Sequence, residues 1–261
     1  MIITMRKINL SYQKNVRDLG GLIGFNGKKV KEGRIYRGGY LCRVSTKDID
    51  TINSLHLTDI VDFRGEDEFV ERPDYRFEGV TYHNLPSMKS DVKKEDSKTE
   101  DSNLLWFLGD NTDGFAHMYN LYPELLTHEI GINALRKFFE LLVSKDNGVF
   151  YYHCSQGKDR AGLASYLLEI ALGVSETDAR EDYLITNEAM GVKIKNLKFM
   201  LRNESFYNET YEKALEEVFS AKEEYLDHAL ETVKAIYGSI ENYLKETLKV
   251  DVNKLRALYL E

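Results

Sequence analysis

The chain lacks several features on which common classes of protein depend. It holds only two cysteines in 261 residues, Cys42 and Cys154. If one of them must stay a free thiolate, no disulfide framework remains, and this favours a reducing compartment. No stretch of 18 apolar residues is present, so we expect no membrane span. Residues 1–7 contain no apolar segment of the length that a secretory signal needs, and we therefore predict a cytoplasmic protein.

Positive charge is scarce as well. The 35 Lys and Arg residues are outnumbered by 43 Asp and Glu residues, which gives a formal net charge of −8. This balance argues against a general binder of nucleic acid or of acidic membranes. The sequence also shows no internal repeat, no dinucleotide fingerprint and no His/Cys cluster with the spacing of metal ligands. We therefore expect no cofactor, no metal and no nucleic-acid partner.

What the chain does contain is a cysteine and an arginine that enclose five residues. Residues 153–162 read HCSQGKDRAG and stand between an apolar strand-like run and a helix-like run. In such a loop the backbone N–H groups can point inward, and the next helix directs its positive N-terminus at the same place. Arg160 can hold two phosphate oxygens with its planar group. The same field favours a thiolate at Cys154, which makes this residue a nucleophile.

Two other interpretations of this segment were weighed against that one. Cys154 could be a buried structural cysteine beside a strand-to-helix turn. A nucleotide-binding loop is excluded, because Gly157-Lys158 is followed by Asp159 instead of Ser or Thr and no glycine stands five positions before Gly157. The segment predicts an anion-binding loop with a nucleophilic sulfur.

The rest of the chain predicts an α/β fold. Buried strands are expected at 59–63 and 80–85, and each precedes a helical element, which favours a parallel-dominated central sheet flanked by helices. Shorter β-like pieces are expected around 28–30 and 34–36, with a tight turn at 15–21. Helices are expected at 45–55, at 132–143, from the cysteine loop to Gly173, and from Ser175 onward.

Two segments differ from this pattern within one domain that spans 1–261. Residues 87–103 hold five acids and four lysines and almost nothing apolar. They predict either a solvated excursion or a lid over the site. Residues 190–261 carry no strand signal, and we expect them to form a helical extension packed onto the sheet.

Taken together, these motifs resemble the bacterial atypical tyrosine and dual-specificity phosphatases that also act on phosphoinositides. This family is a branch of the cysteine-dependent phosphatase superfamily. The similarity covers nearly the whole chain, and the Gly-Lys-Asp-Arg inside the loop is the mark of this branch. The matching blocks are residues 15–21, 33–38, 59–64, 153–162 and 225–244. The resemblance implies a sheet with the phosphate loop at its carboxyl edge, a single phosphatase domain, no metal and a phosphocysteine intermediate.

The resemblance also implies a role for each residue of the loop. Cys154 would attack phosphorus, and Arg160 would bind the equatorial oxygens. Backbone N–H donors would come from the four residues that follow Cys154, namely Ser155, Gln156, Gly157 and Lys158. The Lys158 side chain would select substrates with a second anionic group, or else face solvent. His153 would bond to the backbone behind the loop and tune the thiolate.

Two aspartates are candidates for the general acid. Asp159 lies in the loop itself, whereas Asp62 ends a neighbouring strand, where open α/β sheets place ligand-binding groups. A bound phosphate dianion would raise the pKa of either carboxyl and so favour its acid form. We favour Asp159. The alternative interpretation of Asp62 is an acceptor for loop N–H groups or for an arginine such as Arg37.

One position departs from the superfamily. Ala161 follows the loop arginine, where Ser or Thr is usual. That hydroxyl is thought to hydrogen-bond the cysteine sulfur as it leaves in the second step. Formation of the phosphoenzyme should survive the change, and its hydrolysis should be slowed.

The leading interpretation is a phosphomonoesterase that acts on phosphotyrosine proteins, with phosphoserine or phosphothreonine and phosphoinositides as further substrates. One alternative is a sulfur transferase or arsenate reductase with a similar loop. Another is a very slow or non-catalytic binder of phospho-ligands, to which Ala161 gives some weight.

Overall fold

The computed structural model describes residues 6–13, 15–89, 113–203 and 207–261. Its strands are β1 (Arg6–Lys7), β2 (Arg17–Asp18), β3 (Ile35–Gly39), β4 (Asp59–Asp62), β5 (Thr81–Asn84) and β6 (Phe150–Cys154). Its helices are α1 (Thr46–Asn53), α2 (Glu66–Glu71), α4 (Gly114–Thr127), α5 (Glu129–Leu142), α6 (Arg160–Leu172), α7 (Glu176–Arg202), α8 (Glu209–Phe219), α9 (Glu223–Tyr237), α10 (Ile240–Asn242) and α11 (Val252–Tyr259). Two short segments are η1 (Phe25–Gly27), a 3-10 turn, and η2 (Tyr243–Thr247), a π-helical stretch.

The strands of this part of the chain form one sheet in the order β1-β2-β3-β6-β4-β5. β6 lies between β3 and β4 and runs parallel to both, and β5 is parallel to β4. Only β1 and β2 add antiparallel pairings among these strands. The predicted parallel-dominated sheet is therefore confirmed. Because Asp62 pairs in register with His153, the ends of β4 and β6 reach the same edge.

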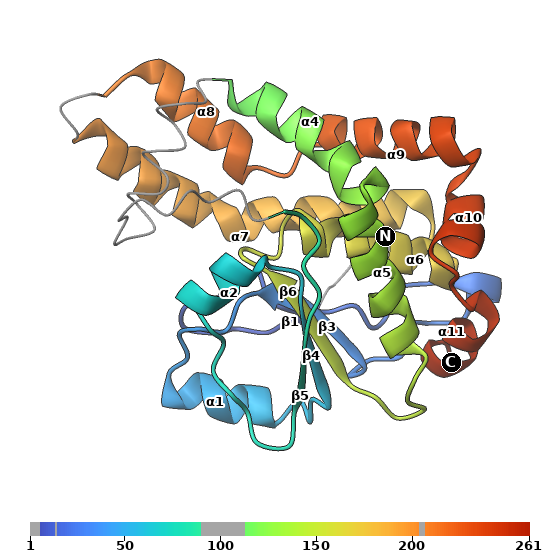
Figure 1. Cartoon of the computed structure of the whole chain (residues 1–261). Coiled ribbons are helices and arrows are strands. Elements are labelled where there is room, and N and C mark those ends of the chain that lie inside the picture. Colours follow the sequence, from blue (N-terminus) through green and yellow to red (C-terminus); the bar gives the residue numbers. More distant parts are fainter. Residues whose placement is uncertain (1–5, 14, 90–112, 204–206) are drawn as a thin grey trace.

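Alternation along β6 sends its side chains into two separate cores. Phe150, Tyr152 and Cys154 belong to the larger core, which also holds residues of α4, α5, α6 and α9. Tyr151 belongs to the smaller core beneath α1. Figure 1 shows α1 on one side of the sheet and the helices from α4 to α9 gathered on the other. Cys154 consequently faces α6, and His153 faces the opposite side.

The C-terminal third is helical, as expected, and it completes the larger core. α9 packs on α4, and α11 packs on α6. Near the C-terminus, Leu260 forms an isolated antiparallel β-bridge with Val30. The expected boundary of this extension at residue 190 falls inside α7, which is unbroken from Glu176 to Arg202.

Local signals in the sequence explain most helix ends. Asp48 N donates to Ser45 Oγ at 3.2 Å and Ser45 N donates to Asp48 Oδ2 at 2.9 Å, which is a capping box at the start of α1. Gly173 ends α6 with a φ of 83°. Other expectations were wrong in detail. The piece at 28–30 forms only isolated bridges, and the predicted turn at 15–21 contains β2.

Most of the polar insertion expected at 87–103 lies outside the described residues. None of the helices in the part of the chain that the structure describes is long and apolar enough to cross a bilayer.

Candidate active site

The loop that joins β6 to α6 is pressed against β3. Gly157 in this loop has a φ of +69°, which favours glycine. A Cβ on it would come within 2.4 Å of the carbonyl carbon and oxygen of Gly38. Both the positive φ and the close contact with Gly38 therefore require glycine at position 157. This contact fixes the shape of the loop from below.

Cys154 and Arg160 hold the two ends of this loop. Cys154 is the last residue of β6 and is 2% exposed, while Arg160 is the first residue of α6. The sulfur therefore sits at the floor of the loop, and the free N–H groups that open α6 lie at its rim. Helix and strand together place a cysteine sulfur, backbone N–H groups and a guanidinium around one loop.

Arg160 binds a carboxylate that no local pattern in the sequence predicts. Glu68 on α2 accepts from Nη1 at 2.5 Å and from Nη2 at 3.0 Å. Arg160 Nη2 also lies 3.0 Å from Ser155 Oγ, and that hydroxyl donates to Glu68. Burial alone would raise the pKa of Glu68, but the charge and hydrogen bonds of Arg160 lower it to about 2. Glu68 is therefore ionised at neutral pH.

Buried polar side chains also bind the carbonyl oxygens of the loop. Asn15 Nδ2 donates to the carbonyl oxygens of Gln156 and Gly157, each at 3.1 Å. Arg37 Nη2 donates to the Gly157 oxygen at 2.9 Å. Because these loop carbonyls are bound from below, the N–H groups of the loop are free to point into the site. This arrangement is what an anion-binding loop requires.

Asp182 on α7 neutralises the buried arginines beneath the loop. It accepts from Arg17 Nε at 2.8 Å and from Arg37 Nη1. Burial opposes its charge, yet the two arginines lower the pKa of Asp182. Nearby Glu169 is buried next to Asp182, and burial together with that charge raises the pKa of Glu169 well above its ordinary value. These shifts favour the charged form of Asp182 and the protonated form of Glu169.

Asp159 lies at the open side of the loop. Its Oδ1 accepts from the Tyr122 hydroxyl at 2.7 Å and lies 2.8 Å from Lys158 Nζ. Its side chain is 24% exposed. Tyr122 is in turn 2.8 Å from the Tyr183 hydroxyl, so the carboxyl is held at one oxygen by a chain of buried groups.

Asp62 has a different environment. Arg64 binds it through Nε at 3.0 Å from both carboxylate oxygens and through Nη2 at 2.8 Å from Oδ2. The Arg64 N–H also donates to Oδ1. Asp62 is therefore an acceptor for an arginine, as its alternative interpretation proposed, although the arginine is Arg64 and not Arg37.

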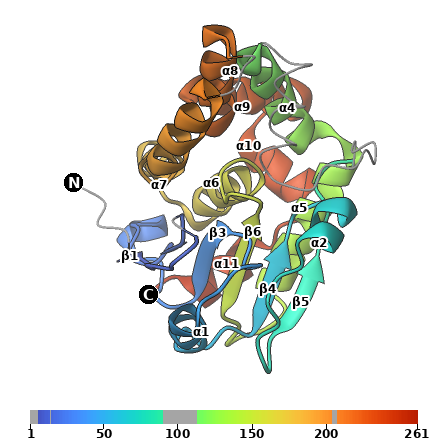
Figure 2. The same cartoon turned by 90° about the vertical axis from the view of Figure 1, so that its left-hand side faces the viewer.

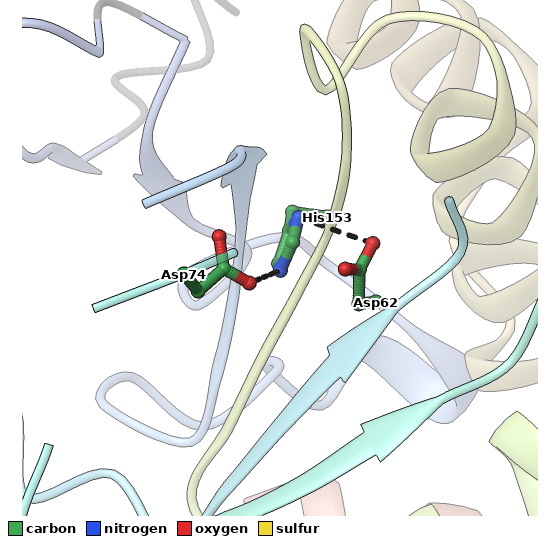
Figure 3. Close-up of side chains that lie close together, drawn as sticks. All are labelled: Asp62, Asp74 and His153. Atoms are coloured by element: carbon green, nitrogen blue, oxygen red, sulfur yellow. Dashed lines mark ion pairs between the residues drawn. The ribbon is translucent and has the colours of Figure 1, made fainter. Parts of the chain in front are cut away.

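His153 lies behind the loop between two carboxylates (Figure 3). Its Nε2 is 2.9 Å from Asp74 Oδ2, and its Nδ1 is 3.7 Å from Asp62 Oδ1 and 3.1 Å from the Cys154 carbonyl oxygen. Burial opposes protonation of the ring, but Asp74 and Asp62 raise the pKa of His153. Its ring faces away from the open side of the loop.

Asp62, Asp74 and His153 are also the one trio in the described chain whose ligand atoms could surround a metal ion, all within 4.8 Å of one another. The guanidinium of Arg64 lies 2.8 Å from Asp62 and 3.3 Å from Asp74. This guanidinium contacts both carboxylates, and the carboxylates in turn raise the pKa of His153 and so favour the charged ring. The trio is therefore an ion-pair network that fits a cation poorly.

The remaining predicted site residues are distributed around the loop. Gln156 is partly exposed and lines a cleft next to the loop. Lys158 is only 3% exposed, and its Nζ donates to the carbonyl oxygens of Val218 at 2.6 Å and Ser220 at 3.2 Å. Its ammonium thus binds the end of α8 instead of facing an anion in the loop. Ala161 is fully buried, and its carbonyl accepts from Ser165 Oγ at 2.8 Å.

The sequence reasoning missed the partners that hold the site together. Glu68, Asp74, Tyr122 and Asp182 were not singled out. The first two follow β4 within 12 residues, and acids so close to the carboxyl end of a buried strand are a usable signal. Tyr122 and Asp182 lie on helices with no local feature that marks them, so only the folded chain identifies them.

The sequence is similar to those of known proteins. Residues 8–261 match the sequence profile of the tyrosine phosphatase family. A Cupriavidus necator protein named as a tyrosine-protein phosphatase is 28% identical over 94% of this chain and 85% of its own length. The triple specificity protein phosphatase PtpB of Mycobacterium tuberculosis is 25% identical over 94% of this chain and 99% of its own.

Two solved structures show weaker likeness. The core catalytic domain of the PP-IP phosphatase SIW14 from S. cerevisiae, in complex with citrate, is 14% identical, with a TM-score of 0.33 over 70% of this chain and 85% of that one. TpbA of P. aeruginosa, in complex with pTyr, is 12% identical, with a TM-score of 0.31 over 88% of each chain. Because the family profile covers almost the whole sequence, this chain belongs to the tyrosine phosphatase family and is a phosphatase.

Proposed function

We propose that the protein is a metal-independent phosphomonoesterase that works through a phosphocysteine intermediate. Its substrates would be phosphotyrosine in proteins, with phosphoserine or phosphothreonine, and phosphoinositides. The observation that carries this proposal is the placement of Cys154 at the floor and Arg160 at the rim of one loop whose carbonyls are bound from below. The family membership and the broad specificity in the name of PtpB support the substrate range. A cytoplasmic location remains part of the proposal.

The charge of the substrate would be balanced by the protein's own groups. Loop N–H groups and the N-terminus of α6 meet the phosphate oxygens, and Arg160 binds two of them. Glu68 occupies the two terminal nitrogens of Arg160. The edge formed by Nε and Nη2 can still present two parallel donors to phosphate once Ser155 Oγ gives up its contact with Nη2. Glu68 would in this way orient the guanidinium without blocking it.

The reaction would run in two displacements. The Cys154 thiolate attacks phosphorus, the P–S bond forms, the bond to the ester oxygen breaks, and an acid gives its proton to that oxygen. Water then attacks phosphorus, gives a proton to the same carboxylate, and the P–S bond breaks to restore the thiolate. Phosphate leaves as the second product.

Asp159 fits the role of this acid better than Asp62. One Asp159 oxygen is held by Tyr122 and Lys158, and the side chain is open to solvent on the loop side. Arg64 binds both oxygens of Asp62 in a buried ion pair. Protonation of Asp62 would therefore break this ion pair.

The first test is Cys154→Ser. We expect turnover of p-nitrophenyl phosphate to fall by at least about 1,000-fold, while vanadate still binds because the loop amides and Arg160 remain. EDTA should leave the wild-type rate unchanged. Retention of most of the wild-type turnover by Cys154→Ser would overturn the mechanism.

The second test separates the two acids. Phosphoserine has a poorer leaving group than p-nitrophenyl phosphate and depends more on protonation. Asp159→Asn should therefore lose more activity on phosphoserine than on p-nitrophenyl phosphate. Asp62→Asn should reduce both to a similar extent. The reverse pattern would assign the acid to Asp62.

A further inference from the structure

A cleft of about 290 Å³ opens beside the phosphate loop. Its walls come from three parts of the chain that lie far apart in sequence. They are Tyr12, Gln13 and Asn15, then Tyr40 and Arg43, and the face of α7 between Ala189 and Leu197. Gln156, the second residue after Cys154, forms part of the wall. Figure 2 shows α7 next to the β1 edge of the sheet. Because Gln156 belongs both to the loop and to the wall of the cleft, the two spaces are adjacent.

The walls of the cleft are directly bonded to the loop. Asn15 donates to the Gln156 and Gly157 carbonyl oxygens at 3.1 Å. Tyr40 N donates to the Ser155 carbonyl oxygen at 3.3 Å. These bonds fix the distance between the cleft and the phosphate loop. The two sites can therefore select substrates in which two groups are separated by that distance.

The charge of the cleft is opposite to that of the whole protein. The chain carries a net charge of −8, yet none of the described residues that line the cleft is acidic. Two lining residues are cationic, the exposed Arg43 and Lys193, whose Nζ lies 5.2 Å from the Phe219 ring centroid. Amide side chains, Gln13 and Asn196 among them, add hydrogen-bonding groups. This combination suits an anion that carries neighbouring hydroxyl groups.

Lys158 had been the expected source of a second positive charge. Its ammonium is instead buried against the carbonyls of Val218 and Ser220 and paired with Asp159. Selection of a second anionic group must therefore come from outside the loop, and the cleft is where cationic side chains border it.

We propose that this cleft binds a second phosphate of a polyphosphorylated inositol ring whose first phosphate occupies the loop, with Arg43 and Lys193 as the residues that determine this specificity. The inference rests on the proposed phosphatase function. An inositol ring fits because it carries its phosphates and hydroxyls on adjacent carbons of one small rigid body. The ring can be part of a lipid headgroup or a soluble inositol phosphate, and the two share this chemistry.

The test compares substrates that differ only in the second phosphate. kcat/KM is measured for dioctanoyl phosphatidylinositol monophosphate and bisphosphate, and for the corresponding soluble inositol phosphates, with p-nitrophenyl phosphate as the single-phosphate reference. The variants are Arg43→Gln and Lys193→Met, the latter of which keeps a long unbranched side chain but removes the charge. Each should lower the bisphosphate-to-monophosphate ratio about 10-fold, and Arg43→Lys should restore most of it.

The controls are Lys47→Gln on α1 and Lys195→Gln on α7, which remove an exposed positive charge outside the cleft lining. They should not change the ratio. A loss seen only with lipids, or only with soluble rings, identifies the source of the ligand. Equal losses on monophosphate and bisphosphate would overturn the inference while leaving the phosphatase function intact. A loss confined to phosphotyrosine peptides with acidic neighbours would also overturn it. Absence of wild-type turnover on every substrate would instead refute the proposed function.

Discussion

Asp182 and Glu68 each hold an arginine next to the phosphate loop, but from opposite sides and in different surroundings. Asp182 lies beneath the loop with its side chain 1% exposed, between Arg17 and Arg37. Glu68 lies at the mouth with its side chain 34% exposed, against Arg160. A buried ion pair that loses one partner leaves an unpaired charge in a medium of low dielectric constant, whereas a pair at the surface can exchange its partner for water or ligand. The same pairing is therefore permanent beneath the loop and exchangeable at its mouth.

The largest effect should come from breaking the lower pair. Asp182→Asn removes the carboxylate that Arg17 and Arg37 share in a buried site, and we expect a loss of about 3–5 kcal/mol in the free energy of unfolding. Urea denaturation at pH 7 measures it. The matched control is Asp227→Asn, which breaks a partly exposed pair with Arg180 and should cost about 1 kcal/mol or less. Similar losses in the two variants would contradict the distinction between the buried and the open pair.

Ala161 offers a kinetic test on the buried side. One hydrogen bond to a charged group is worth about 1.5–3 kcal/mol, so its absence should slow breakdown of the phosphoenzyme by roughly 10- to 150-fold. Rapid mixing should show a burst of product equal to the enzyme concentration. Ala161→Ser should raise kcat and remove the burst without raising kcat/KM, which reports formation of the intermediate. Wild type without a burst, and no gain in Ala161→Ser, would mean that another donor serves the leaving sulfur.

The loop could be predicted from the sequence, whereas the two acids that hold its arginines could not. Spacing alone predicts that Cys154, Arg160 and the glycine between them share one loop between a strand and a helix, and the structure has this arrangement because strand, loop and helix are local in sequence. Glu68 and Asp182 pair with arginines 92 and 145 residues away, and no local pattern states which acid meets which arginine. Lys158 shows the limit clearly. Its position in the loop was correct, but the carbonyls at the end of α8 decide where its side chain points.

Breaking the pair at the mouth should change catalysis more than stability. Glu68→Gln keeps the shape of the side chain and removes a negative charge beside the phosphate site. We expect a loss of stability of about 1 kcal/mol or less. Inorganic phosphate should inhibit the variant more strongly, since a repulsive charge is gone, while kcat falls because Arg160 is less well oriented. Glu66→Gln on the same helix removes one exposed charge and should change neither. Weaker phosphate inhibition in Glu68→Gln would mean that orientation of Arg160 outweighs repulsion even in the ground state.

His153 gives the smallest and most specific test, since it lies behind the loop between Asp74 and Asp62. Its pKa is raised in the folded protein, where Asp74 and Asp62 outweigh burial. A group with a raised folded pKa stabilises the protein fully below its unfolded pKa of about 6.5 and loses that contribution as pH rises through the folded value. The stability advantage of wild type over His153→Gln should therefore be largest near pH 6 and shrink toward pH 9. In the background of Asp74→Asn, which removes the nearer carboxylate, the trend should weaken. An advantage that instead grows with pH would show that burial prevails, that the ring is neutral, and that the charge near Cys154 comes only from Arg160 and the loop.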